Sequence, residues 1–222
     1  MKIALLGTGA VGQAFAARLV ELGHQVMIGT RNVEEKKTDK KFLEFLSAHP
    51  KVTLAVFSEA AASGEIIVNV GKGAHAIEML HLTGEKNLNG KVLIDISNPL
   101  DFSKGMPPGL IPELSNFNSL GEEIQKQFPS VKVVKTLNTM WNGLMLHPKL
   151  IGNGDHINYI CGNDADAKIK VISLLNEFGW LNENILDLGD ITSARATEAT
   201  LPIWLRVYGL KKTGAFNFNI VS

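Results

Sequence analysis

Three absences limit what this 222-residue sequence can be. It has one cysteine, Cys161, so no disulfide can form within the chain. It has no apolar run near the ~20 residues that a membrane-spanning helix needs, and the apolar segment after Met1 and Lys2 is too short for a signal-peptide core. It has no excess charge either, with 22 basic and 22 acidic side chains. These absences favour a cytoplasmic protein and argue against a nucleic-acid or membrane partner.

Short apolar strands alternate with helical patterns in the first two thirds of the chain. This order is typical of an α/β fold of the Rossmann type, a doubly wound parallel sheet with helices on both faces. The expected strands are Lys2–Leu6, Gln25–Ile28, Thr53–Val56, Glu65–Val70, Val92–Ile96 and Val131–Leu137. The expected helices are Val11–Leu22, Lys36–His49, Ala74–Leu82 and Ser119–Phe128. The segment Phe102–Phe117 is rich in proline, glycine and serine and is expected to be a surface loop.

The last third of the chain is less regular. We expect two short strands separated by a helix, and then a long helical pattern that Pro202 interrupts. The segments are Ile157–Cys161, Ala165–Phe178, Ile185–Leu188 and Thr192–Leu210, with Phe216–Val221 as a final strand or an extended tail. The sequence therefore predicts a Rossmann domain over residues 1–152 and a small appended α/β lobe over residues 153–222.

A glycine-rich motif joins the first expected strand to the first expected helix. In a dinucleotide-binding loop Gly7 permits the tight turn, Gly9 lets the backbone approach the pyrophosphate, and Gly12 lets the helix pack closely on the strand. The N–H groups and the dipole at the helix N-terminus attract the phosphates. The predicted loop consists of Gly7, Thr8, Gly9, Ala10, Val11 and Gly12.

The end of the second expected strand indicates which dinucleotide binds. NAD enzymes place an acidic residue there, about 20 residues beyond the glycines, to bind the ribose 2′-hydroxyl. This chain has Thr30, Arg31 and Asn32 instead. The Arg31 guanidinium can pair with a 2′-phosphate, Thr30 and Asn32 can donate hydrogen bonds to it, and Lys36 can add charge. We therefore expect NADP(H) to bind, with Arg31 as the main source of the preference over NAD(H).

Further motifs follow one another along nearly the whole chain. They are His75-Ala76-Ile77, Asp95-Ile96-Ser97-Asn98-Pro99, Lys135-Thr136-Leu137-Asn138, Ile160-Cys161-Gly162-Asn163, and Ser193-Ala194-Arg195 followed by Glu198 and Leu201-Pro202. Together with the glycine loop and Gly29-Thr30-Arg31-Asn32, they make the sequence resemble the NADPH-dependent deazaflavin oxidoreductases, also called F420-dependent NADP reductases. The sequence is also similar to the cytosolic domains of the six-transmembrane metalloreductases.

The resemblance implies hydride transfer between NADP(H) and a deazaflavin (coenzyme F420) or a flavin (FMN or FAD). In this family the nicotinamide lies over the carboxyl ends of the strands, and the acceptor binds in the cleft beside it. The residues implied at the nicotinamide end are Val70, Gly71, His75, Ser97, Asn98 and Pro99. The resemblance also implies that Asn138 faces the shared cleft and that Arg195 lies in the lobe that closes it. Two positions depart from the family pattern, because a bulkier residue is common at Gly71-Lys72-Gly73 and a histidine at Asn138. Both departures affect the acceptor.

Hydride transfer between two cofactors depends on positioning and on exclusion of water, and it needs no acid–base pair. The sequence shows no such pair. His75 and Asn138 are the candidates for a catalytic role, although a histidine at a helix start is equally well explained by a local hydrogen bond. The other histidines have no metal-ligand spacing, so we expect no metal site.

Two other functions stay open. A non-catalytic NADPH-binding sensor or subunit would also need no acid–base pair. A reductase of imines or β-hydroxyacids shares this kind of first domain, but such enzymes carry a larger helical second domain than the last seventy or so residues provide. The dense apolar residues of Ala199–Leu210 make a homodimer possible.

Overall fold

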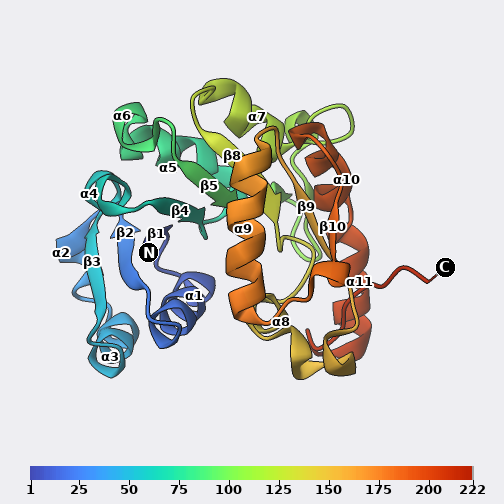
Figure 1. The fold of residues 1–222 in the computed structure, drawn as a ribbon, viewed down its shortest axis with the longest axis horizontal. Helices are drawn as coiled ribbons and strands as arrows, with labels where there is room; N and C mark the ends of the chain where they lie inside the picture. The colour runs from blue at the N-terminus through green and yellow to red at the C-terminus, as the bar shows by residue number, and fades with distance from the viewer. Residues whose placement is uncertain (222) are drawn as a thin grey trace.

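The computed structural model describes residues 1–221 and is built around one eight-stranded sheet with the strand order β10-β9-β8-β5-β4-β1-β2-β3 (Figure 1). The strands from β3 to β8 in this order are parallel, whereas β9 pairs antiparallel with β8. This confirms the predicted Rossmann-type α/β class. The strands are β1 (Lys2–Leu6), β2 (Gln25–Thr30), β3 (Val52–Val56), β4 (Ile66–Asn69), β5 (Val92–Asp95), β8 (Lys132–Thr136), β9 (Asn158–Cys161) and β10 (Ile185–Asp187).

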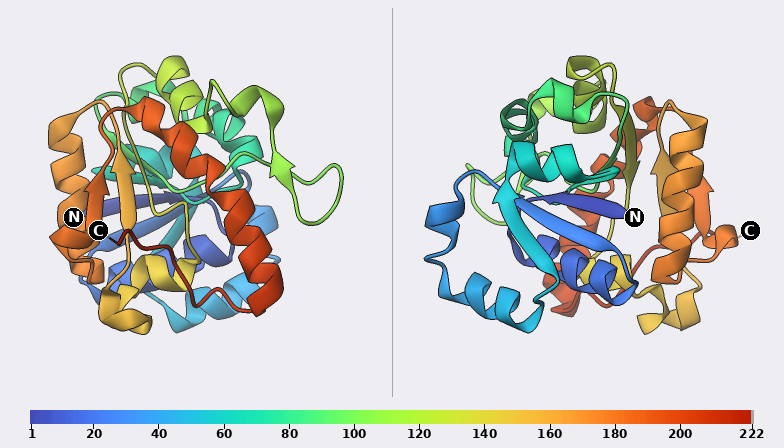
Figure 2. Two further views of the ribbon diagram at one scale, coloured as in Figure 1. Left: turned by 90° about the vertical axis from the view of Figure 1, so that its right-hand side faces the viewer. Right: turned by 60° about the vertical axis from the view of Figure 1, so that its left-hand side comes forward.

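Helices cover both faces of the sheet (Figure 2). Alternate residues of β1 point to opposite faces, so Ile3 and Leu5 join one buried cluster while Ala4 and Leu6 join the other. The first cluster includes residues of α1 (Ala10–Glu21), α3 (Lys40–Ala48), α8 (Asn142–Leu146) and α9 (Ala165–Phe178). The second includes residues of α4 (Phe57–Ser63), α5 (Ala76–Thr83), α6 (Glu85–Leu88), α7 (Leu120–Gln127) and α10 (Ala194–Ala199).

The single helix predicted over Lys36–His49 is wrong. The structure has a short helix α2 (Val33–Lys36), a turn, and then α3. Asp39 ends the turn, because its Oδ1 accepts a hydrogen bond from the N–H of Phe42 at 3.2 Å and so caps α3. Helices α4 and α8 were not expected from the sequence.

The segment predicted as a loop over Phe102–Phe117 contains short regular elements. A two-stranded ribbon, β6 (Leu100–Asp101) and β7 (Gly109–Leu110), begins just before it, and a 3-10 turn spans Pro112–Leu114. The chain between β6 and β7 projects from the body of the molecule (Figure 2). This ribbon places apolar side chains next to the end of β5.

The predicted C-terminal lobe continues the sheet, because β9 and β10 pair with each other and β9 pairs with β8. The division at residue 152 stays a prediction. The long helical pattern breaks as expected into α10 and α11 (Leu201–Lys211), with Pro202 in the first turn of α11. The tail from Phe216 forms no strand in the part of the chain that is described, but the N–H of Ile157 donates to the carbonyl of Phe218 at 3.2 Å. No helix within residues 1–221 has both the length and the apolar character needed to cross a membrane.

Candidate cofactor and active site

The glycine loop has the geometry of a phosphate cradle. Gly7 has a φ of +132°, which side-chain-bearing residues rarely adopt, and a Cβ on Gly12 would lie 2.3 Å from the Gly7 carbonyl oxygen. A Cβ on Gly9 would meet nothing within 4 Å. Gly9 is also the N-cap of α1 and provides no side-chain cap for its first N–H groups. The loop is therefore tightly packed at Gly7 and Gly12 and open at Gly9, which leaves room for the phosphate groups of a ligand.

Two pockets lie on either side of this loop. The adenosine-side pocket, of about 500 Å³, includes Gly7 and Thr8 and the residues after β2. The nicotinamide-side pocket, of about 610 Å³, includes Val11 and the residues after β4 and β5. Both lie at the carboxyl ends of parallel strands, where ligands of doubly wound sheets bind. A further pocket of about 540 Å³ opens beside Lys2 and Gln25, at the opposite ends of β1 and β2.

Six predicted cofactor ligands line the adenosine-side pocket, namely Gly7, Thr8, Thr30, Arg31, Asn32 and Lys36. Lys36 is already paired, with its Nζ 2.6 Å from Asp39 Oδ2, and this hydrogen bond lowers the pKa of Asp39 below its usual value. The Oδ1 of Asn32 accepts from the N–H of Glu35 at 3.1 Å and caps α2. The Arg31 side chain is 64% exposed, against 19% for Lys36, and its Nη2 pairs with Glu78 Oε1 at 3.1 Å.

The nicotinamide-side pocket combines apolar walls with a few polar groups. Five residues predicted at the nicotinamide end line it, namely Val70, Gly71, His75, Ser97 and Asn98. Further walls come from Val11, Ile96, Leu100, Phe102, Ile111 and Met145. Pro99 does not line the pocket, but its carbonyl accepts from the N–H of Ile111 at 2.8 Å and fixes the ribbon that forms one wall. A pocket of this composition suits a flat, mostly apolar ring system.

Asn138 does not line the pocket, but it contacts Asn98, which does. It is 1% exposed, and its Nδ2 donates to Asn98 Oδ1 at 2.9 Å, while Asn98 Nδ2 donates to the Asn138 carbonyl at 2.7 Å. The reciprocal pair fixes the Asn98 amide that borders the pocket. The Oδ1 of Asn138 has no hydrogen-bond partner within residues 1–221, and Leu137 before it has a left-handed φ of 61°. Strained backbone and orphaned acceptors are frequent at ligand sites.

His75 and Arg195 have polar partners outside the nicotinamide-side pocket. The His75 side chain is 63% exposed and its Nδ1 lies 3.8 Å from Glu78 Oε2. Arg195 donates from Nε to Glu122 Oε2 at 2.8 Å, and lines neither of the two pockets beside the glycine loop. Neither residue forms an acid–base pair inside the nicotinamide-side pocket.

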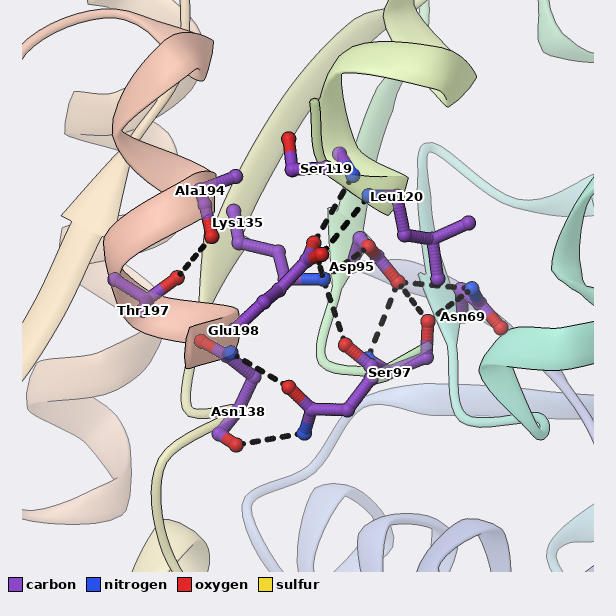
Figure 3. Close-up of polar contacts among 12 residues, drawn as sticks. Asn69, Asp95, Ser97, Ser119, Leu120, Lys135, Asn138, Ala194, Thr197 and Glu198 are labelled. Atoms are coloured by element: carbon purple, nitrogen blue, oxygen red, sulfur yellow. Dashed lines mark hydrogen bonds and ion pairs between the residues drawn. The ribbon is translucent and has the colours of Figure 1, made fainter. Parts of the chain in front are cut away.

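A buried ion cluster lies beneath the ends of β5 and β8 (Figure 3). Lys135 Nζ is 2.8 Å from Asp95 Oδ2 and 2.7 Å from Glu198 Oε1, and all three side chains are at most 1% exposed. Glu198 comes from α10, and its two carboxylate oxygens also accept from the N–H groups of Leu120 and Gly121 at 2.9 and 3.0 Å. The carboxylate therefore caps the N-terminus of α7, where the helix dipole favours negative charge.

The cluster extends to both loops of the nicotinamide-side pocket. Lys135 Nζ donates to the carbonyl of Ser97 at 2.6 Å, and Ser97 Oγ donates to Asp95 Oδ1 at 2.7 Å. Asn69 Nδ2 donates to the same Asp95 oxygen at 2.8 Å (Figure 3). Asn69 Oδ1 in turn accepts from the N–H of Gly71 at 3.1 Å. One set of buried hydrogen bonds thus connects α10 with the loops after β4 and β5.

Burial and charge act in opposite directions in this cluster. Burial alone would lower the pKa of Lys135, but the attraction of Asp95 and Glu198 outweighs it and raises that pKa. Burial raises the pKa of Glu198, and Lys135 partly opposes the shift. Sequence reasoning placed these residues in family motifs but assigned them no role. The available signal was a lysine within the apolar run around Val133 and Val134, because a buried charge needs a partner.

Comparison with known proteins agrees with this geometry. The model of the family described as "NADP oxidoreductase coenzyme F420-dependent" matches residues 2–99. A crystal structure from Arthrobacter sp. FB24, of a protein whose name as an F420-dependent NADP reductase is itself inferred, is 49% identical and superposes with a TM-score of 0.95, and the match covers 100% of both chains.

Two curated proteins are also similar. The F420-dependent NADP reductase of Methanothermobacter marburgensis is 39% identical over 110 residues, which are 47% of this chain and 48% of that protein. Metalloreductase STEAP3 of Rattus norvegicus is 30% identical over 210 residues, which are 91% of this chain and 38% of that protein. The matched segments thus cover less than half the length of each of these two relatives. The glycine loop, the two pockets and the full-length match together show that the chain belongs to the family of F420-dependent NADP oxidoreductases.

Proposed function

We propose that this protein transfers hydride between NADP(H) and a deazaflavin, such as coenzyme F420, or a flavin. The observation that carries the proposal is the nicotinamide-side pocket of about 610 Å³ directly beside the phosphate cradle. Its apolar walls and small number of polar groups suit a ring system stacked against a nicotinamide. The names of the relatives support the same chemistry.

The chain's own residues have three tasks in this reaction. The N–H groups at the start of α1 bind the pyrophosphate, and Arg31 binds the 2′-phosphate. Asn98, fixed by Asn138, orients the nicotinamide end. The apolar walls, including Phe102 in the segment between β6 and β7, exclude water from the reacting atoms. NADPH itself supplies the hydride when it is bound.

The test is NADPH oxidation by the purified protein, followed at 340 nm, with deazaflavin, FMN, FAD, ferric chelate or no acceptor, and with NADH in parallel. We expect turnover with deazaflavin or a flavin, and a preference for NADPH that Arg31→Ala removes. Arg18→Ala is a suitable control for the loss of one positive charge, because Arg18 lies in the last turn of α1, away from the glycine loop. NADPH binding without turnover with any of the acceptors would contradict the proposal.

A non-catalytic NADPH-binding module is the second candidate. It is favoured by the positions of the two expected catalytic residues, because His75 is exposed and Asn138 lies behind Asn98. It predicts NADPH binding and a ligand-induced conformational change without turnover. The acceptor panel separates the two functions, since a free small acceptor that is reduced excludes a pure sensor.

We also propose a cytoplasmic homodimer. The supporting observations are the buried, unpaired thiol of Cys161 and three exposed apolar side chains of α11, Ile203, Tyr208 and Leu210. Analytical ultracentrifugation at several concentrations tests the dimer. A monomer at every concentration would rule it out.

A further inference from the structure

Glu78 connects the two pockets on either side of the glycine loop. It lies in the first turn of α5, and its Oε1 accepts a hydrogen bond from Arg31 Nη2 at 3.1 Å. Its other oxygen lies 3.8 Å from His75 Nδ1. Arg31 lines the adenosine-side pocket and His75 lines the nicotinamide-side pocket. One carboxylate therefore contacts a residue of each pocket.

The cation assigned to the 2′-phosphate is thus already paired with an anion of the protein. Carboxylate and phosphate oxygens use the same N–H groups of a guanidinium. A 2′-phosphate that approaches Arg31 must displace or share Glu78, and the two anions repel each other at this distance. Lys36 does not compensate, because its Nζ is 2.6 Å from Asp39.

We propose that Glu78 is a specificity-determining residue that competes with the 2′-phosphate for Arg31. This inference rests on the NADP(H) site proposed above. Binding of NADPH then exchanges the Arg31–Glu78 ion pair for an Arg31–phosphate pair. NADH carries a hydroxyl at that position and leaves the ion pair in place. Glu78 therefore weakens the binding of NADP(H) selectively, and gives Arg31 a partner when the nucleotide leaves.

The exposure of the pair sets the size of the effect. The side chains of Arg31 and Glu78 are 64% and 58% exposed, so solvent screens their attraction. Exposed ion pairs of this kind change an equilibrium by a factor of about two to five. We therefore expect Glu78→Gln, which keeps the shape and removes the charge, to lower the NADPH dissociation constant about two- to fivefold.

The experiment measures the dissociation constants of NADPH and NADH by fluorescence titration for four forms of the protein. These are the unchanged chain, Glu78→Gln, Arg31→Ala and the double variant. Glu21→Gln is the matched control, because the Arg18–Glu21 pair has a similar N–O distance of 3.2 Å and Glu21 is 61% exposed. The control corrects for the general effect of removing one negative charge.

Competition predicts three results together. Glu78→Gln tightens NADPH binding more than Glu21→Gln does, leaves NADH binding unchanged, and has no effect when Arg31 is already alanine. Weaker NADPH binding in Glu78→Gln would mean that Glu78 holds Arg31 ready for the ligand, and would overturn the proposal. An equal gain for NADH and NADPH, or a full gain in the Arg31→Ala background, would overturn it as well.

The same titrations separate this inference from the proposed function. If the unchanged chain does not bind NADPH, or Arg31→Ala leaves the NADPH preference intact, the NADP(H) site itself is wrong. If that preference depends on Arg31 but Glu78→Gln behaves like Glu21→Gln, only the role of Glu78 fails.

Discussion

Replacing Lys135 by methionine tests the buried ion cluster. Methionine has a similar length and no charge, so the change leaves Asp95 and Glu198 buried without the cation that lies 2.8 and 2.7 Å from them. It also removes the donor to the Ser97 carbonyl. Removing one partner of a buried ion pair typically costs about 3–5 kcal/mol. Since small proteins are stable by about 5–15 kcal/mol, this variant loses a large part of its stability.

The assay is urea unfolding followed by circular dichroism, and Lys132→Met provides the matched control. Lys132 lies on the same strand three residues away and pairs with Asp164 at 2.9 Å, but its side chain is 39% exposed. An exposed pair contributes about 0–1 kcal/mol. We therefore expect the unfolding free energy to fall several times further in Lys135→Met than in Lys132→Met.

Equal losses in the two variants would refute the interpretation of the cluster as a buried ionic network. If Lys135→Met yields no folded protein, Glu198→Gln gives a second measurement. Glutamine keeps one acceptor for the α7 N–H groups but loses the charge next to Lys135. A loss below about 1 kcal/mol in that variant would refute the same interpretation, because a carboxylate shared by a buried lysine and two N–H groups is expected to contribute more.

Three further predictions concern single residues. Gly12→Ala should weaken NADPH binding at least tenfold, or about 1.4 kcal/mol, because its Cβ would lie 2.3 Å from the Gly7 carbonyl oxygen; unchanged binding in a titration would contradict this packing. Gly9→Ala should leave the unfolding free energy nearly unchanged, since its Cβ meets nothing within 4 Å, while lowering NADPH affinity by occupying the cradle. Burial raises the pKa of Cys161 to about 12 from 9.0, so the folded thiol should resist thiol reagents. The folded state keeps this thiol neutral, and the stability that this contributes is present below pH 9 and is lost as the pH rises towards 12. If the melting temperature of Cys161→Ala fell as steeply over this pH range as that of the unchanged chain, the result would contradict this prediction.

Much of the fold could be predicted because its signals are local. The apolar strands and the glycine turn each specify their structure within a few residues, and the loop at Gly7–Gly12 adopts the expected form. The sequence did not predict the break between α2 and α3. The Asp39 cap is a local signal, but it lies within a charged run whose pattern also predicts one continuous helix.

The location of the candidate site could be predicted from the sequence, but the contacts between its side chains could not. The residues that line the two pockets follow strands whose carboxyl ends meet at one edge of a parallel sheet, so their order along the chain indicates them. The contacts of Arg31 with Glu78 and of Lys135 with Glu198 join residues 47 and 63 positions apart. No spacing rule connects such residues, because the tertiary fold alone brings them together. For the same reason the sequence could not show that Asn138 lies behind Asn98.

The buried cluster determines whether the part of this chain before β9 can be used by itself. Asp95 and Lys135 belong to the strands of the nucleotide-binding sheet, but their second carboxylate comes from Glu198, far along the chain. A protein cut before β9 would lose the Glu198 carboxylate that pairs with Lys135 and accepts from the N–H groups of Leu120 and Gly121, and it would expose the edge of β8 that β9 covers. The nucleotide-binding part is therefore a poor candidate for transfer into a fusion protein unless residues through α10 accompany it.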